Sequence, residues 1–206
     1  MAIRAIAFDV FGTLVRIARP RRPYRRLLRL LQAQGRPPQP DDAARLMARP
    51  LTLAQAAQAL DARLPPATLA ALQAELDIEL ASITAFPDTA LALPALRARG
   101  LRIALCSNLA APYGPPALAR LPLRPDFCAW SYAAGAIKPQ AAIYTYLCEG
   151  LGCAPDEVLM IGDTPKADLH GPRAFGMQAC LLDRQGRATA GATHLRSLME
   201  VEDRVG

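Results

Sequence analysis

The sequence predicts an α/β fold in which a doubly wound parallel sheet is interrupted by a helical insertion. The first observation is a set of five short apolar runs that alternate with segments of helix length, a pattern typical of parallel sheets. These runs are residues 3–8, 101–106, 126–132, 158–161 and 178–182. The second observation is that residues 16–86 repeat their apolar side chains at helical spacing instead. Because the apolar runs are unbroken, we expect strands that are buried on both faces.

The length of 206 residues suits one core with a modest insertion rather than two large domains. We assign residues 1–15 and 87–206 to an α/β core domain, and residues 16–86 to an inserted α-helical cap domain. The segment Phe86-Pro87-Asp88 is the expected return linker.

The first strand, residues 3–8, ends at Asp9 and is followed by a turn at Gly12-Thr13. Four helices should then form the insertion. In the first, Tyr24 and Leu31 belong to an apolar stripe opposite a row of arginines, and the helix should end near Gly35. The other three are expected over Asp41–Ala48, over Leu53–Leu64, and from Pro65-Pro66 to Ile83.

Composition places the chain among ordinary globular proteins, with 52% hydrophobic and 20% charged residues. Neither a cleavable leader nor a run of about 20 apolar residues is found, so we expect a cytoplasmic protein without a membrane partner. The five cysteines are odd in number and lack C-x-x-C spacing, which favours free thiols over disulfides or a zinc site.

Basic charge is concentrated in residues 16–86, which hold eleven arginines against six acids. This surplus could steer an anionic substrate, bind nucleic acid or only solvate a helix face. Nucleic-acid binding would be expected to add stacking aromatics, and Tyr24 alone is present in the arginine run. A solvated helix face is the preferred interpretation of the run as a whole, and Arg16 and Arg19, just past the first predicted strand, are the two that we expect to face a small anionic substrate.

Polar residues follow the ends of several predicted strands, where ligands bind in open α/β sheets. Asp9 follows the first strand, and Ser107-Asn108 follow the second. The later ones are Lys138-Pro139, Gly162-Asp163 and Asp168. We expect these side chains to converge on one crevice.

The segments FDVFGTL, CSN, IKP and IGDTPKAD occur in that order along the chain. They resemble the four motifs of the haloacid dehalogenase superfamily over residues 3–15 and 88–183. The resemblance implies a Rossmann-like core, and the insertion is similar to the helical cap of the family's first cap class.

The resemblance also implies the roles of individual residues. Asp9 would be the nucleophile that forms a covalent aspartyl intermediate. Lys138 and Ser107 would hold the anionic centre, Asp168 would orient Lys138 or the metal's waters, and Thr13 and Asn108 would contact the substrate. Oxygen atoms of Asp9 and Asp163 and the backbone carbonyl of Phe11 would bind Mg²⁺.

Phe11 departs from the phosphatase pattern, in which a second aspartate protonates the leaving group. With an aromatic residue at this position, the first motif resembles that of 2-haloacid dehalogenases, which work without metal. Gly162-Asp163 instead resembles the fourth motif of the metal-binding phosphatases. Three functions stay open: dephosphorylation of a substrate with a good leaving group, dehalogenation, and binding of a phosphorylated ligand without turnover. His170 is expected to be an exposed histidine at a helix start rather than a replacement acid, and both a monomer and a homodimer fit the sequence.

Overall fold

The computed structural model describes residues 2–186 and 193–205; the other residues that we assign to the core lie outside this description. Six strands form one sheet in the order β5-β4-β1-β6-β7-β8, and every neighbouring pair is parallel. Their bounds are β1 Ala5–Phe8, β4 Arg102–Ser107, β5 Phe127–Trp130, β6 Val158–Gly162, β7 Gln178–Leu182 and β8 His194–Leu195. The predicted parallel sheet is confirmed.

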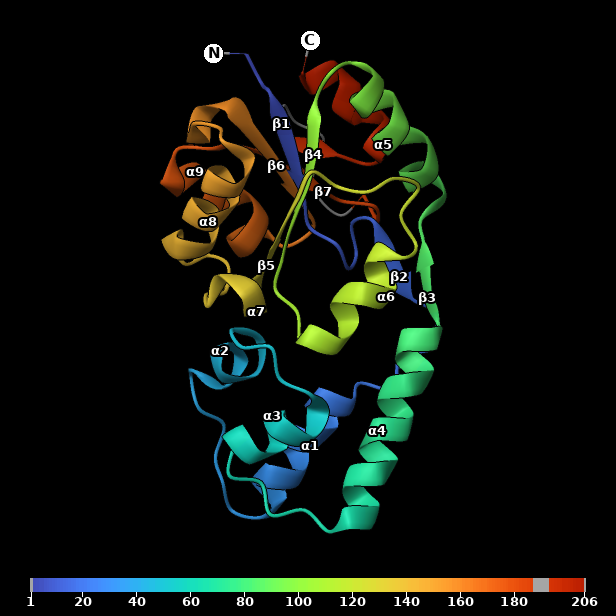
Figure 1. Cartoon of the computed structure of the whole chain (residues 1–206), viewed down its shortest axis with the longest axis vertical. Helices are drawn as coiled ribbons and strands as arrows, with labels where there is room; N and C mark the ends of the chain where they lie inside the picture. Colours follow the sequence, from blue (N-terminus) through green and yellow to red (C-terminus); the bar gives the residue numbers. More distant parts are fainter. Residues whose placement is uncertain (1, 187–192, 206) are drawn as a thin grey trace.

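Helices cover both faces of this sheet (Figure 1). Along β1 the side chains alternate in direction, as in any strand. Ile6 and Phe8 pack in a cluster with residues of α5 and η4, whereas Ala5 and Ala7 pack in a second cluster with residues of α8. The covering elements are α5 (Pro87–Ala98), α8 (Ala141–Leu151), α9 (Gly171–Phe175) and the 3-10 segment η4 (Leu198–Arg204).

Shorter elements connect the strands. They are the 3-10 turns η1 (Ala111–Tyr113) and η2 (Pro155–Glu157), the helices α6 (Gly114–Leu118) and α7 (Ser131–Ala134), and the π-helical segment η3 (Pro165–His170). β5 ends at Trp130, two residues earlier than the sequence predicts, because α7 starts at Ser131, whose hydroxyl accepts a hydrogen bond from the Leu109 N–H at 3.1 Å.

The helical insertion, residues 23–81, lies at one end of the sheet and has a hydrophobic cluster of its own (Figure 1). Its helices are α1 (Pro23–Ala33), α2 (Asp42–Met47), α3 (Leu53–Ala59) and α4 (Pro66–Ala81). All four expected helices are present. α3 ends five residues before the predicted Leu64, because Asp61 takes a left-handed conformation with φ 57°.

A short antiparallel ribbon, which the sequence pattern does not predict, joins the insertion to the core. It consists of β2 (Val15–Ile17) and β3 (Ile83–Ala85), with Arg16 opposite Thr84. The predicted domain limits, 15/16 and 86/87, fall at this ribbon, and Ile83 belongs to a strand rather than to the last helix. Strands of three residues are too short for their alternation to stand out in a sequence.

Glu79 fastens this junction from within α4. Its buried carboxylate accepts hydrogen bonds of 2.5 Å from the backbone N–H groups of Arg21 and Arg22 and from the Tyr113 hydroxyl. Arg22 has φ 58°, a left-handed conformation that costs a non-glycine residue free energy. The two N–H bonds to Glu79 compensate for that cost and fix the direction in which α1 starts.

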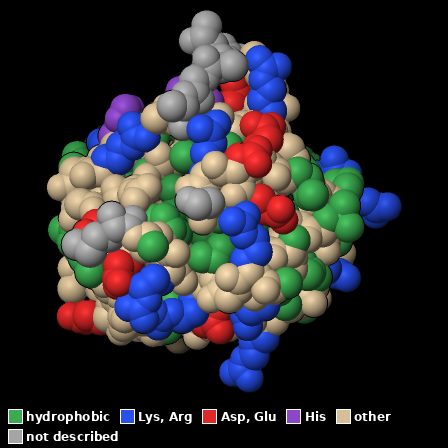
Figure 2. All heavy atoms as spheres, turned by 90° about the horizontal axis from the view of Figure 1, so that it is seen from above, with side chains coloured by type: hydrophobic (Ala, Val, Ile, Leu, Met, Phe, Trp, Pro, Cys, Tyr) green, Lys and Arg blue, Asp and Glu red, His purple; other side chains and the backbone are tan. Residues whose placement is uncertain are grey.

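The surface farthest from the insertion shows arginine and acidic side chains interspersed (Figure 2). Within residues 2–186 and 193–205, no helix has the length and apolar character needed to cross a membrane.

Candidate active site

The sheet register brings the ends of three strands to one level. Phe8 in β1 pairs with Leu105 in β4 and with Ile161 in β6. The residues that follow these positions therefore meet at the carboxyl edge of the sheet. They line a pocket of about 170 Å³ formed by Asp9, Phe11, Ser107, Asn108, Lys138, Asp163, Thr164, Ala167 and Asp168.

Lys138 lies at the centre of the buried charges in this pocket. Its Nζ donates to Asp9 Oδ1 at 2.8 Å, to Asp168 Oδ1 at 2.6 Å and to the Cys106 carbonyl at 2.6 Å. Lys138 is only 4% exposed and Asp168 only 1%. An ion pair this deeply buried needs such complete hydrogen bonding to offset the loss of hydration.

These contacts shift the ionisation of the buried groups. Burial alone would lower the pKa of Lys138, but the adjacent carboxylates of Asp9 and Asp168 outweigh it and raise that pKa. Burial raises the pKa of Asp168, and the charge of Asp9 adds to the rise while Lys138 opposes it. The ammonium group thus stays charged and holds two carboxylates near each other.

Asp9 offers one oxygen for chemistry. Its Oδ1 accepts hydrogen bonds from Lys138 and from the Ser107 hydroxyl, the latter at 2.9 Å. Among the described residues no hydrogen bond reaches Oδ2. Two donors therefore fix the carboxylate plane and leave the second oxygen available as a nucleophile.

Asn108 positions the Lys138 loop. Its side-chain amide donates to the Lys138 carbonyl at 2.9 Å, and its Oδ1 accepts from the Lys138 N–H at 2.7 Å. Both polar atoms of the amide are thus engaged in the fold. Asn108 lines the pocket as expected, but its hydrogen bonds hold the lysine loop.

Three carboxylates could hold a metal ion. Oxygen atoms of Asp9, Asp163 and Asp168 all lie within 4.8 Å of one another. Asp163 is exposed at the mouth of the pocket, and its pKa is raised by partial burial and by the charge of Asp9. Hard carboxylate oxygens whose charges repel one another are suited to a divalent cation, and Phe11, whose carbonyl completes the predicted ligand set, lines the same pocket.

Two glycines make room for these carboxylates. Gly12 has φ 90°, and a Cβ there would lie 2.2 Å from Asp163 Oδ2. A Cβ on Gly162 would lie 2.4 Å from the Asp168 carboxyl carbon. Any larger residue at either position would push an acidic side chain out of the cluster.

Three residues predicted to contact substrate lie elsewhere. Thr13 is fully buried, and its hydroxyl has no hydrogen-bond partner among the described residues. Arg16 and Arg19 are exposed and do not line the carboxylate pocket or the cavity of about 630 Å³ between the insertion and the core. Val15 and Ile17 of β2 pack against the core, whereas the Arg16 guanidinium lies over the Phe86 ring, 5.7 Å from its centroid.

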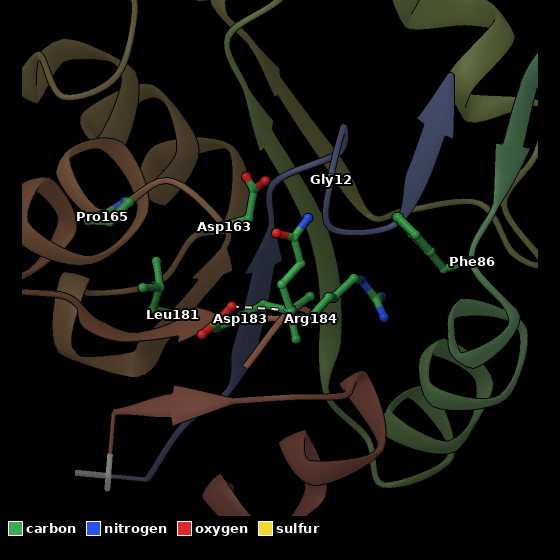
Figure 3. A pocket seen from close by; sticks show the side chains of 9 residues that line it. Gly12, Phe86, Asp163, Pro165, Leu181, Asp183 and Arg184 are labelled. Carbon is green, nitrogen blue, oxygen red and sulfur yellow. Dashed lines mark hydrogen bonds between the residues drawn. The ribbon is translucent and has the colours of Figure 1, made fainter. Parts of the chain in front are cut away.

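Sequence reasoning missed Arg184, which ties the first motif to two distant segments. Its guanidinium forms two 2.9 Å hydrogen bonds with the Asp88 carboxylate, donates to the Thr13 carbonyl at 2.7 Å and lies 4.0 Å from the centre of the Phe86 ring. Partners 96 and 171 residues away leave no local pattern in a sequence. Arg184 also lines a cavity of about 580 Å³ into which Asp163 faces from the other side (Figure 3). His170 is exposed at the start of α9, as predicted.

A larger cavity of about 630 Å³ lies between the insertion and the core, and it shares Phe11 and Asn108 with the carboxylate pocket. The ring of Phe11 contacts Tyr113 edge-on, with centroids 5.7 Å apart. The site is thus a polar pocket that adjoins an apolar cavity.

Comparisons with known proteins agree with this geometry. Residues 3–176 match the family of haloacid dehalogenase-like hydrolases. The chain is similar to a phosphoserine phosphatase of Thermus thermophilus (31% identity, 48% of this chain and 41% of that protein) and to haloacetate dehalogenase H-2 of Moraxella sp. (31% identity, 50% and 46%). The matched stretches thus span about half the length of these curated relatives.

A solved structure supports the fold over almost the whole chain. The HAD phosphatase of Thermococcus onnurineus superposes with a TM-score of 0.69 and 23% identity, covering 99% of this chain and 98% of that one. The family match covers most of the sequence, and residues from all four motifs line the carboxylate pocket at the carboxyl edge of the sheet. The chain belongs to the haloacid dehalogenase-like hydrolases.

Proposed function

We propose that this hydrolase is a Mg²⁺-dependent phosphatase that acts through Asp9 on a small anionic substrate with a good leaving group. The observation that carries the proposal is the third carboxylate, Asp163, beside the Asp9–Lys138–Asp168 group. Three carboxylates around one ammonium group leave an excess of negative charge that a divalent cation would balance. In a metal-free reaction Asp163 would have no role in the chemistry.

The geometry suits a two-step phosphoryl transfer. Asp9 Oδ2 attacks phosphorus, the bond from phosphorus to the leaving oxygen breaks, and an aspartyl phosphate forms. Lys138 and Ser107 keep Oδ1 fixed during the attack, and the lysine supplies positive charge beside the nucleophile. Water then attacks the aspartyl phosphate, which releases inorganic phosphate and restores Asp9.

A Mg²⁺ ion held by Asp9, Asp163 and the backbone carbonyl of Phe11 would supply positive charge against the phosphoryl oxygens. Asp168 acts through Lys138, because its carboxylate accepts hydrogen bonds from Lys138 Nζ and, at 2.9 Å, from the Thr164 N–H. It is therefore a positioning residue for the lysine.

Phe11 limits the substrates that such an enzyme can use. Its ring cannot donate a proton to the leaving oxygen, and general acid catalysis is worth roughly 10²–10⁴ in rate. Substrates whose leaving group departs as a stable anion avoid this loss. Acyl phosphates and aryl phosphates belong to this class.

Phe11 also favours a second candidate, hydrolysis of a carbon–halogen bond, since a halide leaves without a proton. The similarity to haloacetate dehalogenase H-2 is in line with this alternative. Under it, Asp9 attacks carbon, Asp163 has no role, and removal of metal leaves the rate unchanged.

The test is phosphate release from acetyl phosphate and phenyl phosphate, with Mg²⁺ or with chelator, for the wild type, Asp9→Asn and Asp163→Asn. Asp77→Asn is the matched control, because Asp77 is an exposed aspartate on α4. We expect Mg²⁺-dependent release that Asp9→Asn abolishes, Asp163→Asn greatly reduces and Asp77→Asn leaves unchanged.

The same proteins are assayed for halide release from 2-chloropropionate. Chelator-resistant halide release that survives Asp163→Asn would replace the phosphatase with the dehalogenase. No turnover of any substrate, combined with a saturable rise in Tm on adding a phosphorylated ligand, would replace both with a binding protein.

A further inference from the structure

The 630 Å³ cavity between the insertion and the core is lined mainly by apolar side chains. Its lining from the insertion includes Tyr24 and Leu28 of α1 and Leu46 and Met47 of α2, and Leu109 contributes from the core. Ligand pockets of about 300–1,000 Å³ typically enclose small organic molecules. A cavity of about 150 Å³ already holds benzene, so this one has room for more than one ring.

Charged groups in the lining are largely engaged elsewhere. Asp42 is buried and paired with Arg36, which binds both carboxylate oxygens, and its Oδ2 also accepts from the Gln39 N–H at 2.9 Å. The side chain of Arg25 is exposed at the rim. The walls therefore favour an uncharged, apolar group over a sugar or a second phosphate.

The cavity adjoins the reaction centre. Phe11 and Asn108 line both the cavity and the carboxylate pocket. A phosphoryl group beside Asp9 would thus place the rest of its molecule next to the Phe11 ring. That ring cannot protonate a leaving oxygen, so the group in the cavity must leave as a stable anion.

An aromatic leaving group satisfies both requirements, because its ring suits the apolar walls and a phenolate is far more stable than an alkoxide. Resting on the proposed phosphatase function, we propose that this enzyme hydrolyses phosphate monoesters of phenols, with the aromatic ring bound in this cavity. The bond between phosphorus and the phenolic oxygen breaks as Asp9 attacks, and the phenolate takes up a proton from water after it leaves.

The first measurement is kcat/KM for acetyl phosphate, phenyl phosphate and 2-naphthyl phosphate. The two aryl leaving groups have similar acidity, so their difference reports contacts with the cavity. We expect 2-naphthyl phosphate to exceed phenyl phosphate by about tenfold, since apolar contacts of this size discriminate by about that factor or more. Equal or lower values for the naphthyl ester would overturn the proposal.

Two variants alter the walls of the cavity. Ala43→Phe narrows it from an exposed position on α2, and Met47→Ser removes an apolar wall. Each should lower kcat/KM for 2-naphthyl phosphate by about fivefold or more while acetyl phosphate, which does not reach the cavity, is unaffected. The matched controls Ala70→Phe and Met199→Ser replace exposed residues that do not line the cavity and should change neither substrate.

Acetyl phosphate distinguishes a failure of the aromatic-substrate proposal from a failure of the proposed phosphatase function. Normal turnover of acetyl phosphate together with wall variants that do not alter aryl selectivity rejects the aromatic substrate and leaves the phosphatase standing. No phosphate release from any of the three substrates rejects both. The Asp9→Asn variant allows binding to be measured without turnover. Calorimetry should find that it binds 2-naphthyl phosphate more tightly than phenyl phosphate. Equal affinities would contradict binding of the aromatic ring in this cavity.

Discussion

Lys138 stabilises the fold as well as the site, because it separates two buried carboxylates. Lys138→Met would leave Asp9 and Asp168 facing each other without a counter-charge. Breaking a buried ion pair in this way costs about 3–5 kcal/mol. We expect loss of turnover and a fall of that size in the free energy of unfolding, measured by urea titration.

The chain provides its own control for this prediction. Lys166 is its other lysine and is exposed, so Lys166→Met should change the free energy of unfolding by no more than about 0.5 kcal/mol. Equal stability of the two variants would mean that the buried ammonium group contributes nothing net to folding.

Under the proposed phosphatase function, Phe11 restricts which phosphates can be cleaved, and Phe11→Asp tests this directly. An aspartate would place an acid beside the nucleophile, and alkyl phosphate hydrolysis should rise by about 10² or more relative to Phe11→Asn. The asparagine variant has the same shape and loses the same contact with Tyr113, so the comparison isolates the proton. Steady-state rates on an alkyl phosphate measure it, and equal rates would show that a missing acid is not what limits these substrates.

Residues that follow strands could be predicted from the sequence, because the ends of parallel strands converge whatever lies between them. Asp9, Ser107 and Asp163 are found together for that reason. Arg16 lies outside the two pockets because it belongs to β2, whose partner residue Thr84 is 68 residues away in the sequence. That register is not visible in a single stretch of sequence.

At the scale of elements, the end of α3 has a strained cap. The Asp61 N–H donates to the Gln58 carbonyl and the Ala62 N–H to the Ala57 carbonyl, the two bonds of a Schellman motif. Glycine usually occupies the left-handed position of this motif, but here it is Asp61, with φ 57°. Asp61 forms an ion pair with Arg45 at 3.6 Å, and such a contact at the surface contributes little to stability.

Asp61→Gly should therefore raise the free energy of unfolding by up to about 1 kcal/mol. Removing the left-handed strain of a non-glycine residue gains about 1–2 kcal/mol. Part of this gain is lost because glycine gives up more chain entropy on folding. For a chain of this length, the net gain corresponds to a rise in Tm of about 2–4 °C. Differential scanning calorimetry measures it, with Asp61→Asn as the comparison that keeps the backbone strain nearly unchanged. A lower Tm for the glycine variant would show that the Arg45 contact outweighs the strain.

The helices and the long strands were predictable, and their limits were less so. Apolar spacing placed α1 and α4 within two residues at most termini, since a helix of three turns or more repeats its pattern several times. β2 and β3 repeat theirs once, and they form because Val15 and Ile83 bury their side chains against the core. Pairing between distant segments therefore produced the elements that local pattern could not predict.

At the scale of the whole molecule, Asp88 connects the two ends of the core. Its carboxylate accepts from Arg184 after β7, and its Oδ2 also accepts from the Ser197 hydroxyl at 3.1 Å and the Leu198 N–H at 2.9 Å at the start of η4. It lies in the first turn of α5, where the helix dipole favours a negative charge. One carboxylate thus holds together α5, the end of β7 and the C-terminal segment.

The ionisation of Asp88 makes this connection depend on pH. Burial would raise the pKa of Asp88, but the hydrogen bonds from Arg184, Leu198 and Ser197 outweigh it and hold the pKa below its usual value. A group with a lowered folded-state pKa contributes its full stability above the unfolded-state value, about 3.9 for aspartate, and loses it as pH falls through the folded-state pKa. The contribution is therefore complete at pH 7 and declines below about pH 4.

Asp88→Asn tests this prediction, because an amide keeps the shape and removes the charge. The free energy of unfolding at pH 7 should fall by about 2 kcal/mol, the loss typical of a hydrogen-bonded charge. As pH decreases below about 4, the difference from the wild type should shrink toward zero, because the wild-type carboxylate then takes up its own proton. Urea unfolding from pH 7 to pH 3 measures this convergence, and Asp77→Asn, at an exposed site, should follow the wild type throughout. A difference that stayed constant with pH would mean that Asp88 stabilises the core through its shape and hydrogen bonds rather than through its charge.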